Sequence, residues 1–176
     1  MLQPRPPIVV ILGHVDHGKT TLLDSLRKTN LAAREVGGIT QSTHAFQLTT
    51  KDQQPITFID TPGHAAFSQM RTRGGKIADI AILVVAATDG VMPQTKESIA
   101  TIKSAGTPMI VAINKIDIPG ASVDTIKAQL TENGVLVEGF GGNVPVVAIS
   151  AKTGTGLPEL LEMIHLVSSL NPPQAD

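Results

Sequence analysis

The stretch Gly13-His14-Val15-Asp16-His17-Gly18-Lys19-Thr20 decides the fold of this chain. It lies between an apolar run typical of a strand, residues 8–12, and a run with helical spacing, residues 21–26. Glycines at both ends let the backbone curl so that successive N–H groups point inward, and the following helix adds its positive end. The stretch therefore predicts a phosphate-binding loop between a strand and a helix.

The residue types in this loop suit a nucleoside triphosphate. Lys19 is expected to reach the β- and γ-phosphates, and the hydroxyl of Thr20 is a hard oxygen ligand for Mg²⁺. We expect the phosphates to be lined by Val15, Asp16, His17, Gly18, Lys19, Thr20 and Thr21. The spacing of His14, Asp16 and His17 also resembles a metal site, but inward-facing N–H groups leave these side chains to support the loop.

Composition limits the class of protein. A chain of 176 residues is one ordinary domain, long enough to bury roughly 70% of the surface that its unfolded form exposes. It has no cysteine, which fits a reducing compartment such as the cytosol or an organelle matrix. We find no signal peptide and no apolar run of the roughly 20 residues that span a bilayer. A soluble protein without membrane contact is expected.

Charge and aromatic content argue against broad nucleic-acid binding. The 14 basic and 15 acidic residues nearly cancel, so no positive field favours DNA or RNA. Tryptophan and tyrosine are absent and only four phenylalanines occur, which disfavours base-stacking platforms. Contact with RNA, for example through Arg71, Arg73 or Lys76, would be local, and such charges are more often simply solvated.

Short β-branched runs alternate with stretches of helical spacing along the whole chain. This order predicts an α/β fold with a mostly parallel sheet and helices on both faces. The strands are expected at residues 8–12, 56–59, 80–85, 109–113 and 144–149, with an edge strand at 43–49 and a half-buried helix at 157–169.

The remaining segments are expected to be loops and a linker. Residues 30–42, 61–75 and 134–143 have weak periodicity or clustered glycines and are expected to be flexible. Asn171-Pro172-Pro173 ends the last helix. We therefore expect one nucleotide-binding domain at 1–170 and the start of a linker at 171–176.

Asp60-Thr61-Pro62-Gly63 follows the second strand of the central sheet. A carboxylate at this point lies beside a bound phosphate, so Asp60 is expected to hold Mg²⁺ through a water. The N–H of Gly63 would approach the γ-phosphate closely. The alternative is an ordinary Pro-Gly turn after a strand.

Asn114-Lys115-Ile116-Asp117 follows a later strand and indicates which base is bound. The carboxylate of Asp117 only accepts hydrogen bonds, so it suits the N1–H and N2 donors of guanine, whereas adenine would oppose it with an acceptor. Asn114 is expected to bridge the base loop to the phosphate loop, and the stem of Lys115 to lie across the ring. The alternative is a helix-capping turn.

Ser150-Ala151-Lys152 follows the last strand and completes the pattern. The backbone N–H of Ala151 is expected to donate to guanine O6. The tripeptide alone carries little information, but it is the last of four signals in order, each after a strand. Together they predict a site for GTP or GDP at one edge of the sheet.

These motifs resemble those of the translational GTPases. The resemblance rests on the first loop with Gly37-Gly38-Ile39-Thr40, Asp60-Thr61-Pro62-Gly63-His64 and Asn114-Lys115-Ile116-Asp117. Two further stretches, Arg34-Glu35-Val36-Gly37-Gly38-Ile39-Thr40-Gln41 and Asp89-Gly90-Val91-Met92-Pro93-Gln94, are most similar to the bacterial-type initiation factor 2 group. The resemblance covers nearly the whole chain. It implies a three-layer P-loop NTPase of the Ras-like G-domain type, whose mostly parallel six-stranded sheet has one antiparallel edge strand.

The resemblance also implies roles for residues in two switch segments. Thr40 would complete the Mg²⁺ shell only while the γ-phosphate is present. His64 would orient the attacking water, assisted in catalysis by Lys19 and Asp16, although the residue alone also reads as a surface turn histidine. Val15 and Ile39 would form an apolar gate that keeps the histidine away, and Asp16 would help to hold a monovalent cation.

A function follows from the resemblance as an expectation. The domain would bind GTP and GDP with Mg²⁺ and hydrolyse GTP slowly alone and faster on the ribosome, during subunit joining with initiator tRNA. Ribosomal RNA would contact the switch segments, and initiator tRNA would bind domains outside this chain. A monomer in the bacterial cytoplasm or an organelle matrix, without DNA or membrane partners, is expected.

Three alternative functions stay open at this point. One is a translational factor that delivers a special aminoacyl-tRNA, against which residues 37–38 and 92–94 argue. Another is a metabolic enzyme that couples GTP hydrolysis to synthesis, for which we see no second substrate pocket in the sequence. The third is a nucleotide-dependent binding module that scarcely hydrolyses GTP by itself.

Overall fold

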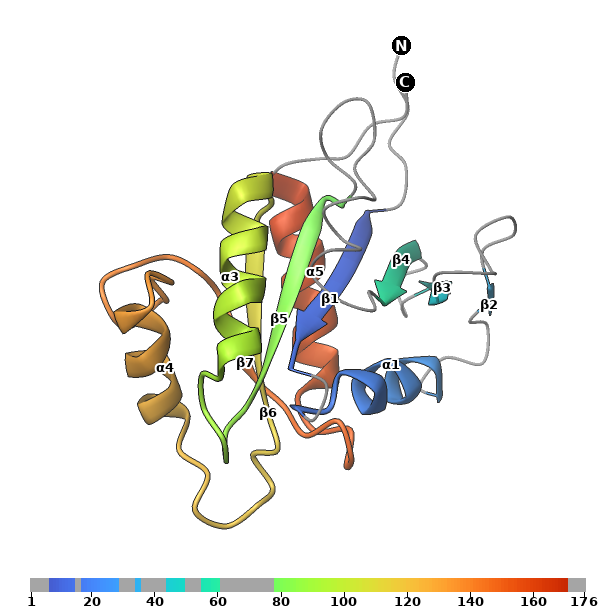
Figure 1. The fold of residues 1–176 in the computed structure, drawn as a ribbon. Helices are drawn as coiled ribbons and strands as arrows, with labels where there is room; N and C mark the ends of the chain where they lie inside the picture. The colour runs from blue at the N-terminus through green and yellow to red at the C-terminus, as the bar shows by residue number, and fades with distance from the viewer. Residues whose placement is uncertain are drawn as a thin grey trace.

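The computed structural model describes residues 7–14, 17–28, 34–35, 44–49, 55–60 and 78–170, which form a sheet with helices packed against it (Figure 1). The strands are β1 (Ile8–Gly13), β2 (Arg34–Glu35), β3 (His44–Thr49), β4 (Pro55–Asp60), β5 (Ile80–Ala86), β6 (Met109–Asn114) and β7 (Val146–Ala148). The helices are α1 (Lys19–Lys28), α3 (Pro93–Ala105), α4 (Val123–Glu132) and α5 (Leu157–Leu170).

The sheet has the order β2-β3-β4-β1-β5-β6-β7. Strands β4, β1, β5, β6 and β7 run parallel, and β3 pairs with β4 in the antiparallel direction. The expected mostly parallel sheet with an antiparallel strand is thus confirmed. The structure adds β2, which has two residues and pairs antiparallel with β3, so β3 is not the outermost strand.

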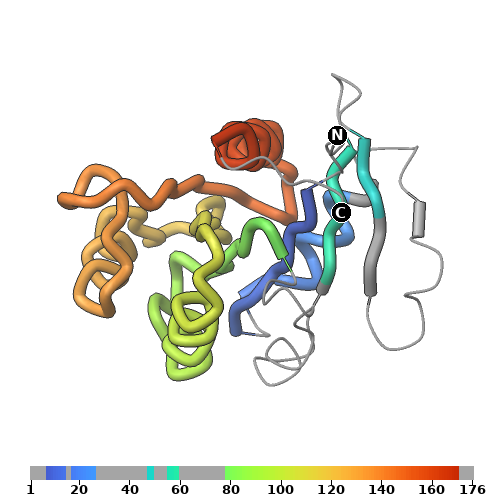
Figure 2. The backbone as a smooth tube through the Cα atoms, turned by 90° about the horizontal axis from the view of Figure 1, so that it is seen from above, coloured from blue at the N-terminus to red at the C-terminus, as the bar shows by residue number. Residues whose placement is uncertain are grey.

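Helices cover both faces of the sheet because its central strands are apolar on both sides. All seven residues of β5 are buried, as expected for a parallel strand between two helix layers. Val9 and Ile11 face the core under α1 and α5, whereas Val10 and Leu12 face the core under α3 and α4. Figure 2 shows α5 on one side of the sheet and α3 on the other. The predicted three-layer fold is confirmed.

The carboxyl ends of the parallel strands meet at one edge, and this positions the site. In the strand register Ile11 lies beside Asp60, Gly13 beside Val84, and Ala86 beside Asn114. The loops that follow β1, β4, β5 and β6 therefore leave the sheet at the same edge, where ligands of open α/β sheets bind.

Residues 134–143 differ from the flexible connection expected from their glycines. Val135 and Val137 are buried in the core beside α4, and bridges pair Val137 with Val144 and Glu138 with Gly142. The segment is a folded loop because alternate valines reach the core. Strand β7 is correspondingly shorter than the expected 144–149.

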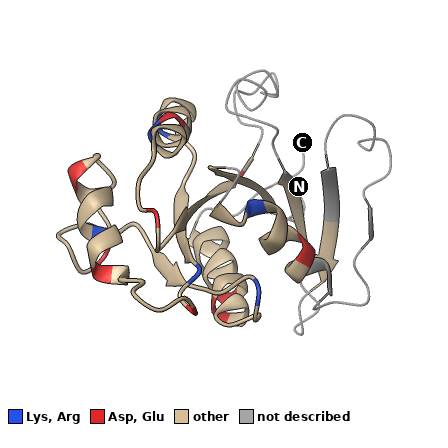
Figure 3. Cartoon of the chain, turned by 60° about the horizontal axis from the view of Figure 1, so that its bottom comes forward, with Lys and Arg blue, Asp and Glu red and all other residues tan. Residues whose placement is uncertain are grey.

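Acidic and basic positions are interspersed over the described elements (Figure 3), in keeping with their near balance in the sequence. Within the described residues, every helix is too short or too polar to cross a membrane.

Candidate functional site

Two glycines shape the loop between β1 and α1. Gly13 has a φ of +148°, and a Cβ there would lie 2.5 Å from the carbonyl oxygen of Val84. Gly18 has a φ of +94°, and its Cβ would lie 2.0 Å from Nδ2 of Asn114. A residue with a side chain would be strained at either position, and at Gly18 the loop lies against the side chain of Asn114.

Helix α1 begins directly after this turn and presents its positive end to the loop. The N–H of Leu22 donates to the carbonyl of Gly18 at 2.8 Å, which starts the helix. Lys19 is buried with 6% exposure, whereas Thr20 and Thr21 are exposed. The positive end of the helix and the Lys19 ammonium both favour an anion such as a polyphosphate at this place.

Two residues of the types that Mg²⁺ prefers as ligands belong to elements that meet at this edge of the sheet. Thr20 lies in the first turn of α1, and Asp60 is the last residue of β4, beside Ile11 of β1. Hydroxyl and carboxylate oxygens are the ligands that Mg²⁺ prefers. The described residues contain no group of three or more histidine, cysteine, aspartate or glutamate side chains that could hold another metal; His14 and His17 instead place their ring centroids 4.7 Å apart.

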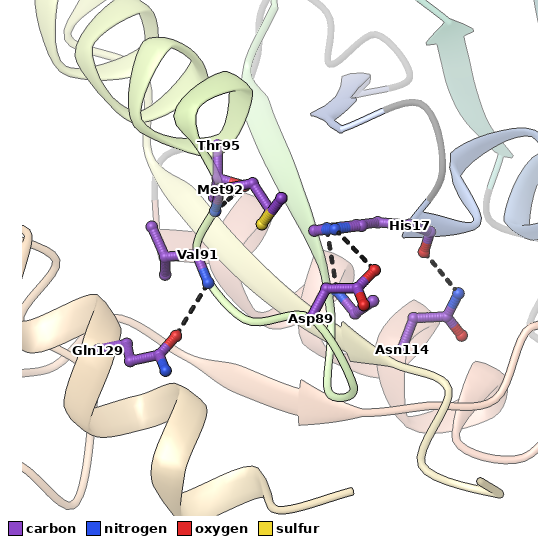
Figure 4. A network of polar contacts seen from close by, with 8 residues as sticks. His17, Asp89, Val91, Met92, Thr95, Asn114 and Gln129 are labelled. Carbon is purple, nitrogen blue, oxygen red and sulfur yellow. Dashed lines mark hydrogen bonds and ion pairs between the residues drawn. The ribbon is translucent and has the colours of Figure 1, made fainter.

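Asn114, at the end of β6, joins the loop that follows β1 to the segment that follows β7. Its Nδ2 donates to the carbonyl of His17 at 2.8 Å, and its Oδ1 accepts from the N–H of Ala151 at 2.9 Å. The residue is 3% exposed, so both bonds are shielded from water. Figure 4 shows the bond to His17. The bridge predicted for Asn114 is confirmed.

The N–H of Ala151 has an acceptor within the protein, the amide oxygen of Asn114. Donation from this N–H to guanine O6 stays a prediction. The carbonyl of Ala151 accepts from the hydroxyl of Ser25 on α1. A contact between this N–H and a base would have to share or replace the bond to Asn114.

Asp117 is held by Ser150 and reaches the surface. The Ser150 hydroxyl donates to Oδ1 of Asp117 at 2.8 Å and accepts from the N–H of Thr153 at 3.3 Å. Ser150 is 1% exposed, whereas Asp117 is exposed. A carboxylate has about four acceptor sites, so it can take further donors such as those of guanine. The structure thus brings Asp117 and Ser150 together as one unit.

Lys115 sits between these groups in an unusual backbone conformation. Its φ is +64°, the only positive value of a non-glycine residue in the described part of the chain. Such a conformation costs on the order of 1 kcal/mol and is common at ligand sites. It turns the chain sharply between Asn114 and Asp117. Lys152, the remaining base-loop residue, is exposed.

Ser25 and the ring contacts of His17 are the parts of the site that the sequence did not predict. Ser25 is an ordinary polar position of an amphipathic helix. His17 was expected to support the loop, and it does so through Ala86 and Asp89, which are distant in sequence. Positions outside the described residues are Val15, Asp16, Ile39, Thr40, Gly63, His64, Arg71, Arg73 and Lys76.

Comparison with known proteins agrees with this geometry. Residues 5–169 match the family described as the elongation factor Tu GTP binding domain. The translation initiation factor IF-2 of Thermus thermophilus is 57% identical over 175 residues, which are 99% of this chain and 30% of that protein. The IF-2 of Roseiflexus castenholzii is 58% identical over 170 residues, 97% of this chain and 23% of that protein. The chain thus spans under a third of the length of these relatives.

Two solved structures that share the fold are translation factors. The GDP-bound aIF5B of Aeropyrum pernix has a TM-score of 0.79 and 36% identity, covering 96% of this chain and 36% of that one. The elongation factor SelB of Methanococcus maripaludis, in its apo form, has a TM-score of 0.70 and 29% identity, covering 99% of this chain and 36% of that one.

Proposed function

The chain belongs to the translational GTPase family that the elongation factor Tu GTP-binding domain represents, and from this premise we propose that it is the nucleotide-dependent switch of an initiation factor 2. GTP binding and GTP hydrolysis are the properties of this family, in line with the sequence. The observation that carries the proposal is Asn114, which ties the carbonyl of His17 to the N–H of Ala151. It would hold the residues proposed to bind the phosphates and the base at a fixed separation.

Recognition of guanine would rest on Asp117. Ser150 orients its carboxylate, which would accept from the N1–H and N2 amino groups of the base. A site whose polar groups hydrogen-bond the ligand disfavours a ligand that leaves them unpaired, although the exposure of Asp117 to solvent reduces this discrimination. Lys115 and Lys152 would flank the ring, and adenine nucleotides would be excluded.

The phosphates would be held by the loop N–H groups, the N-terminus of α1 and the Lys19 ammonium. Thr20, Thr40 and Asp60 would hold Mg²⁺, which supplies charge neutralisation on the β- and γ-phosphates. Because phosphoryl transfer to water requires mainly alignment and charge stabilisation, Lys19 and the loop backbone would supply much of the rate enhancement. Gly63 would place its N–H near the γ-phosphate.

His64 and Asp16 would complete the catalytic set, as the family resemblance implies. His64 would orient the attacking water once the ribosome moves it past Val15 and Ile39. Asp16 would assist through a monovalent cation, which a comparison of hydrolysis rates in potassium, sodium and tetramethylammonium salts would detect. Slow hydrolysis by the isolated domain is therefore expected.

The wider role belongs to the full-length factor. We propose that it acts on the ribosome in the cytoplasm during subunit joining, with ribosomal RNA near the switch segments. Initiator tRNA would bind through parts of the factor beyond this domain, and the domain itself would be monomeric. Delivery of a special aminoacyl-tRNA is the second candidate, because SelB shares the fold at 29% identity; the 57% identity to an IF-2 favours initiation.

The test is phosphate release from GTP with and without purified ribosomal subunits, for the wild-type factor, His64→Ala and His165→Gln. Ribosomes should raise the rate of the wild type and of the control His165→Gln by several orders of magnitude. His64→Ala should bind GTP normally but lose about 10²-fold or more of that stimulated rate. Full stimulation of His64→Ala, or none of the wild type, would reject the proposed mechanism.

A further inference from the structure

The His17 side chain connects the phosphate loop to a distant turn. The residue is fully buried, and its Nδ1 accepts a hydrogen bond from the N–H of Ala86 at 3.2 Å. Its Nε2 lies 3.4 Å from Oδ2 of Asp89, in the turn between β5 and α3. Figure 4 shows the ring between these segments. The imidazole thus connects His17 to Ala86, which lies 69 positions further along the chain.

These contacts select one form of the imidazole. Because Nδ1 accepts from a backbone N–H, it carries no proton itself. The proton therefore sits on Nε2, which faces the Asp89 carboxylate. A ring with one nitrogen as acceptor and the other as donor is neutral, and the hydrogen bond from Ala86 together with the nearby Asp89 carboxylate favours its orientation.

The main chain of the same residue is held as well. The N–H of His17 donates to the carbonyl of His14 at 3.0 Å, and the carbonyl of His17 accepts from Asn114 at 2.8 Å. Side chain and backbone together fix the position of the peptide that leads into Gly18. That peptide precedes Lys19 and the start of α1, where the phosphates would lie.

The turn that receives the ring is itself firmly supported. The N–H of Gly90 donates to the carbonyl of Ala86 at 2.9 Å, and the N–H of Val91 donates to Gln129 of α4 at 2.9 Å. A Cβ at Gly90, whose φ is +74°, would lie 2.3 Å from Oε1 of Gln129. Through His17, the phosphate loop therefore contacts a turn that is hydrogen-bonded to α4.

From this network we propose that His17 is a positioning residue that sets the lifetime of the bound nucleotide, and that it acts through Ala86 and Asp89. The proposal rests on the proposed binding of guanine nucleotides. The ring holds the loop in the shape that receives the phosphates. Without it the empty loop relaxes to other shapes, so that the bound form is less favoured and GDP leaves faster.

Two variants of His17 separate its two contacts. His17→Asn places an amide oxygen near the position of Nδ1 and so keeps an acceptor for the Ala86 N–H. His17→Gln reaches the position of Nε2 and leaves that buried N–H without its acceptor. We expect the rate of fluorescent GDP release to rise about tenfold in His17→Gln and less than about threefold in His17→Asn.

Asp89 provides an independent pair of variants because its side chain is 45% exposed and tolerates substitution. Asp89→Ala removes the carboxylate that lies 3.4 Å from Nε2, whereas Asp89→Asn keeps an oxygen in its place. Release of GDP should be about threefold faster in Asp89→Ala and close to wild type in Asp89→Asn. This pair decides the proposal even where His17→Gln does not fold.

The matched control is Asp79→Ala, at the opposite end of β5. Asp79 accepts from the N–H of Ile8 at 2.8 Å, so this variant also removes a bond between a side chain and a strand. It should lower the thermal midpoint and leave GDP release unchanged. The proposal is overturned where His17→Gln or Asp89→Ala lowers the midpoint but releases GDP at the wild-type rate. Wild-type protein that binds no GDP would instead reject the proposed function itself.

Discussion

The two halves of the site are built in opposite ways. The phosphate half depends on backbone shape, because Gly13 and Gly18 adopt conformations and approaches that a side chain would block. The base half depends on side-chain hydrogen bonds, from Asn114 to the phosphate loop and from Ser150 to Asp117. We therefore expect the phosphate half to lose nucleotide affinity when atoms are added to it. The base half should lose affinity when polar groups are removed.

Adding one methyl group at Gly18 should have the largest effect. Gly18→Ala would strain a φ of +94° and place a carbon 2.0 Å from Nδ2 of Asn114. We expect GDP affinity in calorimetry to fall about hundredfold or more. The control is Gly139→Ala, which has a φ of +87° but open space around it. It should cost about 1 kcal/mol of stability and leave GDP affinity unchanged; equal effects of the two variants would contradict the contrast.

Removing the amide of Asn114 should damage both halves together. Asn114→Ala leaves the carbonyl of His17 and the N–H of Ala151 without their partner. The free energy of unfolding in urea should fall by about 2–4 kcal/mol, and GDP affinity should fall with it. Asn133→Ala, which breaks a comparable bond at the end of α4, should lower stability only. Normal GDP binding by Asn114→Ala would show that the two halves act independently.

The parts of the site that belong to short sequence motifs could be predicted from the sequence. The bridge by Asn114, the glycines of the first loop and the strand ends were predictable because parallel strands deliver their following residues to one edge. The hydrogen bond from the Ala151 N–H to Asn114 was not predictable, since a spacing pattern does not show which acceptor within the protein lies nearest to a backbone donor.

Contacts between residues distant in sequence, and the pairing of a very short strand, could not be predicted from the sequence, for physical reasons. The ring of His17 reaches Asp89 only after the sheet has formed, and β2 is too short to have a period. In residues 134–143 the glycines suggested flexibility, whereas burial of Val135 and Val137 decided the structure. Apolar alternation would have been the better signal.

Removing the hydroxyl of Ser150 should have a moderate effect confined to the base half. Ser150→Ala deprives Asp117 of its donor at 2.8 Å, so the carboxylate is less well oriented. GDP affinity should fall about threefold to tenfold, because Asp117 is exposed and partly solvated. Ser169→Ala, at the far end of α5, should bind GDP normally. If Ser150→Ala bound GDP with unchanged affinity, the orientation of the Asp117 carboxylate would not depend on Ser150.

Ser25→Ala should have the smallest effect. It removes the donor to the carbonyl of Ala151 but leaves Asn114, Asp117 and Ser150 in place. We expect a loss of about 1 kcal/mol in the free energy of unfolding and a change of less than twofold in GDP affinity. A larger loss of affinity, measured by calorimetry, would place Ser25 within the base half itself.

The most direct test of the account is calorimetric titration with GDP, a non-hydrolysable GTP analogue and ADP, for the wild type, Asp117→Asn and the exposed control Asp124→Asn. The account predicts that the wild type and Asp124→Asn bind guanine nucleotides and not ADP. Asp117→Asn should lose about hundredfold or more in GDP affinity. Comparable binding of ADP and GDP, or wild-type affinity in Asp117→Asn, would contradict it.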